Sequence, residues 1–334
     1  MKIIIAIRNI IEVFHSVDEN NIINKKLIIF FSIAFFMLLI IYNENNFKIN
    51  NMKVCICTIG KKENRYIKEF VEYYKKFGID KIFLYDNNDL NDEKFEEIID
   101  HYVKKKFVQI YNFRGKKKKL MIKLWQDCYL RNFKKFDWLA FFDIDEYIYL
   151  KNYKSIKPFL NEKKFENCSK IYLNWIIHTD NNLLYYDNRT LHERFPILEP
   201  NARKNNRNCN ANIKTILRGH IPNLKFKVMH IFNRDIKGCD AYGKVPIINN
   251  YDHMKYPDFL NYYSKSVEEF IEKLNKGDVY FGNKTSFKIH RIKRYFKIND
   301  ITFEKINYIE KKTGLNLTKF RNMLKKTKKN YSQI

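Results

Sequence analysis

Residues 137–147 read DWLAFFDIDEY, and this stretch decides the fold. An apolar run, Trp138–Phe142, ends directly in a polar segment that contains Asp143, Asp145 and Glu146. Short apolar runs bounded by polar residues are typical of buried strands. In open parallel sheets, ligands bind at the carboxyl ends of the strands. The stretch therefore predicts a buried strand that delivers two aspartates to a binding site.

The residues before this stretch alternate between strand and helix patterns. Apolar runs predict strands over 54–59, 81–85 and 107–111, and apolar spacing predicts helices over 63–77, 91–105 and 119–134. This order predicts an α/β fold, with a mostly parallel central sheet and helices on both faces. Beyond residue 165 the pattern is mixed. It predicts strands over 170–177, 213–218 and 224–232, and helices over 256–275 and 301–328 with a break near Gly314.

The N-terminal part has a different character. Residues 27–42 read LIIFFSIAFFMLLIIY and carry no charge, which is about 24 Å of helix at about 1.5 Å per residue. Lys25 and Lys26 precede this run and Glu44 follows it, which favours a cytosolic N-terminus. A cleaved signal peptide fits less well, because no small-x-small site follows. A buried soluble helix is the other alternative, although the run is apolar on every face.

We therefore expect one membrane anchor and one catalytic domain. The predicted parts are a cytosolic tail (1–26), a single-pass type II transmembrane anchor (27–42), a stem (43–51), a catalytic domain (52–300) and a basic helical extension (301–334). In a eukaryotic cell, this topology places the catalytic domain in the lumen of the endoplasmic reticulum or Golgi.

The net charge of +26 invites a second hypothesis, a basic nucleic-acid-binding protein. Residues 1–50 carry a net charge of +1, whereas residues 284–334 carry +12 with aromatic residues between the basic ones. Lysine is frequent throughout the chain, so compositional bias also explains much of this charge. A membrane anchor separates the basic surface from nucleic acid, and we expect no nucleic-acid partner.

Cysteines and common catalytic motifs add little. The six cysteines include no CxxC pair, no zinc-site spacing and no dense disulfide framework, and Cys55 and Cys57 are predicted to be core residues on one face of a strand. Phosphate loops, dinucleotide-binding glycine motifs, nucleophile elbows and HExxH motifs are absent from the sequence.

The chemistry of the Asp143-Ile144-Asp145 segment points to a cation. Two carboxylates directly after an apolar strand are costly unless a metal ion or a basic side chain meets them. Aspartate oxygens suit a hard divalent ion, which usually keeps positions open for substrate phosphates. The alternative is a solvated acidic turn at the end of a strand.

An ordered series of motifs over residues 53–280 resembles glycosyltransferase family 92, formerly DUF23. The series comprises residues 54–60 with Glu63 and Asn64, 77–87, 126–129, 137–147, 174–175, 179–182, 185–189, 193–195, 214–218 and 262–270. The resemblance implies a GT-A fold, as in glycosyltransferase family 2-like enzymes. It also implies a nucleotide-sugar donor, often UDP-galactose, a Mn²⁺ or Mg²⁺ ion and inversion at the anomeric carbon.

The resemblance also implies roles for particular residues. Asp143 and Asp145 would hold the metal, with His230 as a further tentative ligand. The donor-binding residues would be Thr58, Glu63, Asp86 and Asp143. Inversion needs a base on the acceptor side. Asp180 is the first choice for that base, and Glu193 is the second.

The resulting hypothesis is a metal-dependent hexosyltransferase that acts on a glycan or glycoprotein acceptor. Besides the nucleic-acid-binding protein, one alternative stays open: an inactive, membrane-anchored relative that acts as a lectin or scaffold. The intact Asp143 and Asp145 pair argues against the inactive relative.

Overall fold

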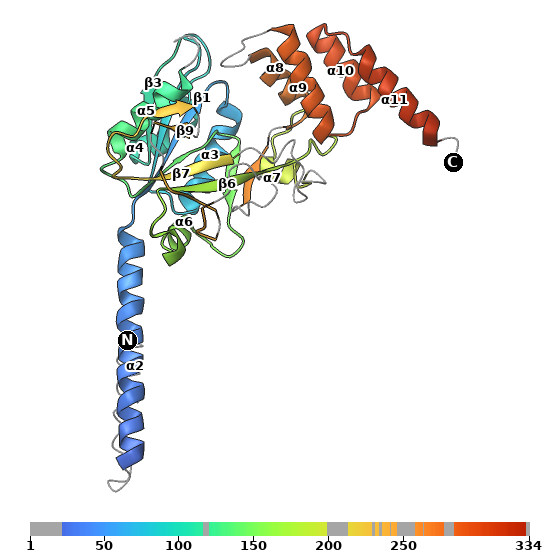
Figure 1. Ribbon diagram of the computed structural model, residues 1–334. Helices are drawn as coiled ribbons and strands as arrows, with labels where there is room; N and C mark the ends of the chain where they lie inside the picture. Colours follow the sequence, from blue (N-terminus) through green and yellow to red (C-terminus); the bar gives the residue numbers. More distant parts are fainter. Residues whose placement is uncertain are drawn as a thin grey trace. The chain divides into compact units, whose positions relative to one another are not determined.

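The structure is a computed structural model that divides the chain into two units, residues 1–52 and 53–334 (Figure 1). It describes residues 22–115, 120–198, 213–228, 231–233, 236–240, 242–245, 258–262, 264–276 and 284–331. The two units are treated separately below.

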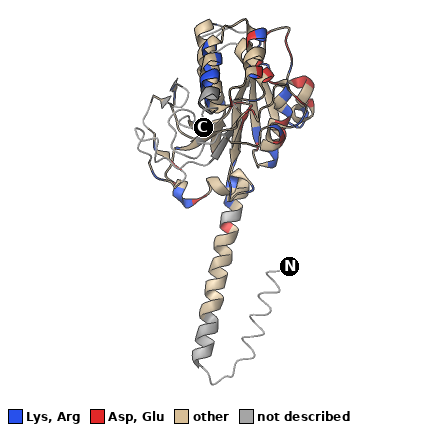
Figure 2. Ribbon diagram, turned by 90° about the vertical axis from the view of Figure 1, so that its right-hand side faces the viewer, with Lys and Arg blue, Asp and Glu red and all other residues tan. Residues whose placement is uncertain are grey.

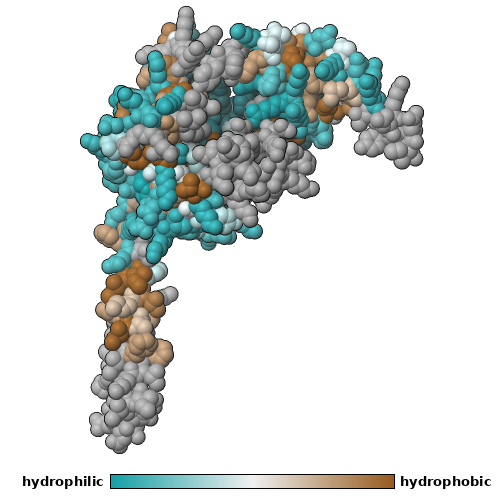
Figure 3. Space-filling view, viewed as in Figure 1, coloured by the Kyte–Doolittle hydropathy of each residue, from teal (hydrophilic) through white to brown (hydrophobic). Residues whose placement is uncertain are grey.

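The part of the first unit that the structure describes, from residue 22 onward, is the long helix α2 (Ile22–Asn51). Its stretch Phe30–Asn51 is 22 residues long, and none of the side chains described there is buried. At about 1.5 Å per residue this stretch is about 33 Å long, which is enough for one crossing of a bilayer. A signal sequence near the N-terminus can have the same length and composition. Where α2 is coloured by hydropathy, its surface is largely apolar (Figure 3), and most of its coloured length carries no Lys, Arg, Asp or Glu (Figure 2). Residues 43–51, predicted to be a stem, continue the same helix.

The second unit is built on a central sheet with nine strands among the described residues. The strand order is β3-β2-β1-β4-β7-β6-β11-β5, and β10 pairs with β6. The sheet confirms the predicted mixed α/β class. The half that contains β1 to β4 is parallel: β1 (Val54–Gly60), β2 (Lys81–Asp86), β3 (Val108–Asn112) and β4 (Trp138–Phe141).

Helices connect these parallel strands as predicted. They are α3 (Asn64–Lys76), α4 (Glu96–Lys104) and α5 (Met121–Asn132), and α4 begins five residues later than its pattern suggested. Cys55 and Cys57 of β1 lie in one buried cluster with Trp125 and Tyr129 of α5, so the prediction that both cysteines face one core is confirmed. Helix α3 packs against β5 (Glu146–Tyr149), where the hydroxyl of Tyr74 donates to the Glu146 carbonyl.

The other half of the sheet is mixed. Strand β7 (Ile213–Arg218) runs antiparallel to β4 and to β6 (Lys170–Ile177), while β11 (Asp258–Asn261) is parallel to β6 and antiparallel to β5. The helix predicted over 256–275 is therefore wrong at its start, because two neighbouring strands fix 258–261 as a strand. The single strand predicted over 224–232 is instead a pair, β8 (Phe226–Val228) and β9 (Ile231–Phe232).

Four helices follow the sheet and share one core. They are α8 (Val267–Lys276), α9 (Thr285–Ile298), α10 (Phe303–Thr313) and α11 (Thr318–Tyr331). Phe270, Tyr295, Ile306 and Phe320, one from each helix, belong to a single buried cluster. Gly314, with φ +67°, ends α10 and gives the predicted break. Lys and Arg residues are numerous along these helices (Figure 2).

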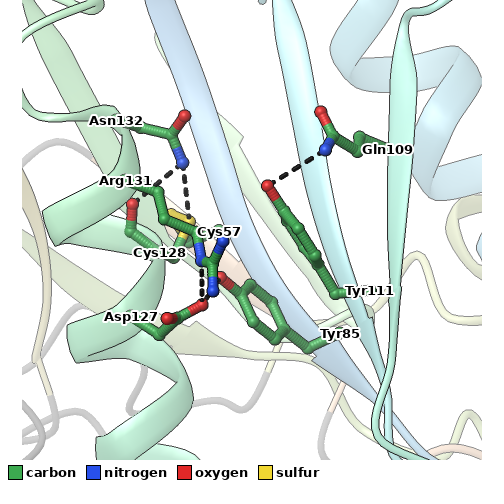
Figure 4. The surroundings of a disulfide bond; sticks show 8 residues. All are labelled: Cys57, Tyr85, Gln109, Tyr111, Asp127, Cys128, Arg131 and Asn132. Atoms are coloured by element: carbon green, nitrogen blue, oxygen red, sulfur yellow. Dashed lines mark hydrogen bonds and ion pairs between the residues drawn. A yellow bond between two sulfur atoms is a disulfide. The ribbon is translucent and has the colours of Figure 1, made fainter.

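Two disulfides lie among the described residues, and they were not predicted from the sequence. Cys57 of β1 bonds to Cys128 of α5 beside Tyr85 and Asp127 (Figure 4), and Cys168 bonds to Cys239 of β10 (Gly238–Cys239). Each bond closes a sequence separation of 71 residues. The sequence spacing gave no sign of these pairs because parallel strands and their helices bring distant residues together. Cys55 is buried and has no disulfide partner.

Candidate active site

The carboxyl ends of β1, β2 and β4 meet at one edge of the sheet. Gly60 of β1 lies beside Asp86 of β2, and Cys57 of β1 lies beside Phe141 of β4, two residues before Asp143. Strand order and register therefore bring the polar segments after three strands together at this edge.

A glycine permits the close packing at this edge. A Cβ atom at Gly60 would lie 2.4 Å from the Phe95 ring and 2.8 Å from the Ile144 side chain. Ile144 lies between the two aspartates in the sequence and is buried. Its side chain packs against the backbone at Gly60, and this contact fixes the loop that carries the aspartates. Any larger residue at position 60 would displace that loop.

Asp143 lies at the exposed side of the edge. Its Oδ2 is 2.8 Å from Nζ of Lys214 on β7, and that ammonium is 2.9 Å from Oε2 of Glu146. Burial raises the pKa of Glu146 to about 8, against the attraction of Lys214. Burial alone would lower the pKa of Lys214, but Asp143 and Glu146 raise it, so this lysine stays charged. The Asp143 side chain is 44% exposed and is therefore open to a ligand.

Asp145 points to the inner side of the edge and meets two lysines. Its Oδ2 is 3.1 Å from Nζ of Lys265 and 2.9 Å from Nζ of Lys273 on α8. Burial alone would raise the pKa of Asp145, but the two ammonium groups hold it well below its ordinary value. This aspartate is therefore a carboxylate at any physiological pH.

Glu63 extends the same cluster. It lies at the start of α3, with Oε1 2.6 Å from Nζ of Lys276 on α8 and Oε2 3.8 Å from Nζ of Lys265. A cavity of about 360 Å³ opens beside these groups, and its lining includes Glu63, Tyr66, Lys265, Lys273 and Lys276. The cavity gives the site room for part of a small ligand.

Asp86 has a different environment from the one expected of a donor contact. The side chain is 1% exposed, with Oδ2 2.9 Å from the Arg114 guanidinium and Oδ1 accepting from the Asn88 amide. Arg114 also donates to carbonyl groups between Asp89 and Glu93. The pair thus holds the loop after β2 in place, and direct contact between Asp86 and a nucleoside stays a prediction.

Unpaired polar atoms gather at the ends of β1 and β2. Among the described residues, Thr58 Oγ1, Asn87 Oδ1 and Asn88 Nδ2 are buried and have no hydrogen-bond partner. Leaving such groups unpaired costs about 1–3 kcal/mol each. Donors and acceptors of this kind suit a polar heterocycle or a ribose, which agrees with the donor role predicted for Thr58.

The residues at the edge can hold a divalent ion only with help from a ligand. Within the described part of the chain, no three His, Cys, Asp or Glu side chains are grouped for metal binding. His230 lies outside the described residues. Mg²⁺ typically takes one or two carboxylates together with substrate phosphates and water, so Asp143 and Asp145 fit an ion bound in that way.

Asp180, predicted as the base, is buried and fully engaged. Its Oδ2 lies 2.6 Å from both the Tyr295 hydroxyl and Nζ of Lys305, and its Oδ1 accepts from the Asn182 amide. The side chain is 2% exposed. These bonds tie the loop after β6 to α9 and α10, which is a structural arrangement, and the role of Asp180 as a base stays a prediction.

Glu193, the second choice, lies in the short helix α7 (Leu191–Arg194). Its carboxylate accepts from the amide and hydroxyl of Thr190, which caps the helix in return. Hydrogen bonds from Thr190 lower the pKa of Glu193. The side chain is exposed and accessible, but it already has this structural task.

Sequence reasoning missed the basic half of the site. Arg114 and the roles of Lys214, Lys265, Lys273 and Lys276 were not predicted. Lys273 and Lys276 are three residues apart on α8, a spacing that places two side chains on one helix face. In a chain with 63 Lys and Arg residues, this spacing was not distinctive.

Comparison with protein families gives one match. The family model for glycosyltransferase family 92 matches residues 50–297, more than half of the chain. A family 92 protein from Oryza sativa subsp. japonica is 27% identical over 119 residues, or 33% of this chain, and one from Ricinus communis is 31% identical over 98 residues, or 29%. The matched regions span 20% and 17% of those relatives' own lengths.

Comparison with solved structures gives distant matches. The structure of S. aureus TarS 1-349 in complex with UDP-GlcNAc has a TM-score of 0.35 at 12% identity, covering 79% of this chain and 80% of that one. Another crystal structure of S. aureus TarS 1-349 has a TM-score of 0.33 at 12% identity, covering 73% of this chain and 71% of that one.

Proposed function

The chain belongs to glycosyltransferase family 92, and we propose from this premise that it transfers a hexose from a nucleotide-diphosphate sugar to a glycan or glycoprotein acceptor. We further propose a UDP-sugar such as UDP-galactose as the donor, dependence on Mn²⁺ or Mg²⁺, and inversion at the anomeric carbon. We also propose that the mixed α/β fold of the second unit is the GT-A fold that the family implies.

One observation supports this proposal above all. The ends of β1, β2 and β4 bring Asp143 and Asp145 together with unpaired polar groups on one side and a cavity of about 360 Å³ on the other. A nucleotide-diphosphate sugar needs these same features: polar groups for the nucleoside, cations for the diphosphate and room for the sugar. An inactive lectin has no need for a carboxylate held ionised beside two lysines.

We propose different roles in the transfer reaction for different residues of the chain. Thr58 would bind the nucleoside, and the Asp86–Arg114 pair would keep the loop around it in shape. Asp143 and Asp145 would hold the metal ion, which when bound supplies positive charge for the leaving diphosphate. Lys214 would keep Asp143 and Glu146 in position.

Inversion requires a base that takes the proton of the acceptor hydroxyl. Asp180 and Glu193 remain the proposed bases, in that order. The bonds of Asp180 to Tyr295 and Lys305 would have to loosen for this role. Substitution of Asp180 by asparagine distinguishes its structural role from its proposed role as the base.

A transfer assay on the full chain in detergent tests the proposal. We expect a panel of UDP- and GDP-sugars with Mn²⁺ to reveal release of one nucleoside diphosphate, and EDTA to abolish it. Asp145→Ala should reduce turnover at least a hundredfold without unfolding. Asp100→Ala, which removes an exposed aspartate paired with Lys104 on α4, is the matched control and should keep full activity. Full activity of the Asp145 variant would overturn the assignment.

We also propose a type II topology, with the catalytic domain in an oxidising lumen. Two disulfides lie within residues 53–334, and disulfides persist in secretory compartments rather than in the cytosol. Protease treatment of sealed microsomes tests this topology. We expect a protected fragment of about the size of the second unit, and complete digestion without detergent would contradict the proposal.

A further inference from the structure

The proposed metal does not explain the role of three lysines of the site, one just before α8 and two within it. Lys265, Lys273 and Lys276 all line the cavity, and together they face two carboxylates, Asp145 and Glu63. Across the edge, Asp143 and Glu146 share the single Lys214. The cavity lining also contains Asp92, Glu93, Glu269 and Glu272, with Lys62 and Arg65 as further cations, so its basic and acidic side chains are equal in number. Lys265, Lys273 and Lys276 are the lining cations that lie beside Asp145 and Glu63.

We propose that Lys273 and Lys276 bind the diphosphate of the donor directly, so that the donor binds even without a metal ion. This inference rests on the proposed function and adds residues to it. The two ammonium groups project from neighbouring turns of α8, at positions three residues apart. Two cations spaced in this way match the two phosphate groups of a nucleoside diphosphate.

Geometry and hydrogen-bond capacity favour these two lysines over Lys265. Lys273 and Lys276 are 27% and 22% exposed, whereas Lys265 is 4% exposed and lies 3.7 Å from the centroid of the Tyr66 ring. An ammonium has three donors, and the bond to Glu63 uses one of those of Lys276. A phosphate oxygen can therefore be added without breaking that bond.

Lys265 serves as a positioning residue. Its backbone has φ +53°, a left-handed conformation that is uncommon for a residue other than glycine. This conformation directs the buried ammonium between Asp145 and Glu63. Because Lys265 stays 3.1 Å from Asp145, Lys273 can turn toward a phosphate without leaving that carboxylate unpaired, while Lys276 keeps its bond to Glu63.

Titration calorimetry of UDP against the full chain in detergent, with EDTA present, tests the proposal. We expect wild-type protein to bind UDP and the Lys273→Gln/Lys276→Gln double variant to bind at least tenfold more weakly. Lys288→Gln, on α9 and outside the cavity lining, is the control and should bind like wild type. Uridine, which lacks phosphates, should bind wild type and double variant equally.

The outcomes are distinct. Equal UDP affinity of wild type and double variant, or no UDP binding by wild type in EDTA, would overturn the proposal. Circular dichroism confirms that each variant is folded. Because the readout is binding, weakened UDP binding by the double variant would support the lysine assignment even if no sugar transfer were detected. If wild type transferred sugar and the double variant bound UDP as tightly as wild type, the proposed function would be supported and the lysine assignment refuted.

Discussion

Substitution of Asp180 by asparagine distinguishes a structural carboxylate from a catalytic base. Asp180 joins the loop after β6 to α9 through Tyr295 and to α10 through Lys305. Asparagine keeps the size of the side chain and an oxygen acceptor but removes the negative charge. The variant therefore tests the ion pair with little change in packing.

The expected magnitude follows from the surroundings of Lys305. Its side chain is 3% exposed, and the Asn182 side chain and the Asp300 carbonyl are its other acceptors. Breaking a buried ion pair from one side costs about 3–5 kcal/mol, because the partner keeps an uncompensated charge. The two neutral acceptors of Lys305 place Asp180→Asn near the lower limit, at about 3 kcal/mol.

Urea unfolding of the full chain, compared with transfer by the folded variant, provides the assay. We expect Asp180→Asn to lower the free energy of unfolding, and addition of Lys305→Met to recover part of the loss because it removes the unpaired cation. Transfer by the folded variant at low temperature should also fall by about 10²–10⁴-fold, which is the contribution of a general base. A loss of transfer smaller than tenfold would refute the proposed base, and an unchanged free energy of unfolding would refute the structural argument.

Two further predictions concern stability. Replacing Cys57 and Cys128 by alanine removes a bond between residues that are 71 positions apart. In a chain-entropy model this should lower the free energy of unfolding by about 4 kcal/mol. An unchanged urea midpoint would contradict the presence of this disulfide. Burial lowers the pKa of His178 from 6.5 to about 4, so the unfolded chain binds the proton first and stability should fall as pH drops from about 6.5 to 4. His178→Gln should flatten the pH dependence of the urea midpoint in this window, and an unaltered slope would show that other groups cause it.

The parallel half of the fold was predictable because its signals are local. An apolar run such as 54–59 has strand length and β-branched residues, and the helix after it shows a clear apolar face. Strand β5 gave no such signal, since it begins at Glu146, a charged residue that reads as part of a turn. Its place in the sheet depends on pairing with β11, more than 100 residues later.

The acidic residues of the site were predictable and the basic ones were not. Asp143 and Asp145 follow an apolar strand, and that context exposes them in the sequence. Lys273 and Lys276 meet carboxylates that are 128 and 213 positions away. No local pattern reports contacts over such distances, and lysine is too common in this chain to stand out.

The pairing of β5 with β11 also sets the order in which the site is completed. Strand β5 lies at the end of the sheet, and β11 is its neighbour in the strand order. Glu146, next to Asp145, cannot reach Asn261 until the ribosome has added 115 more residues. At about 5–20 residues per second, the segment after the two aspartates waits roughly 10 s for its partner. The nascent chain thus carries an unfinished acidic loop during this interval, and a chain truncated before residue 258 would leave that loop without its supporting strand.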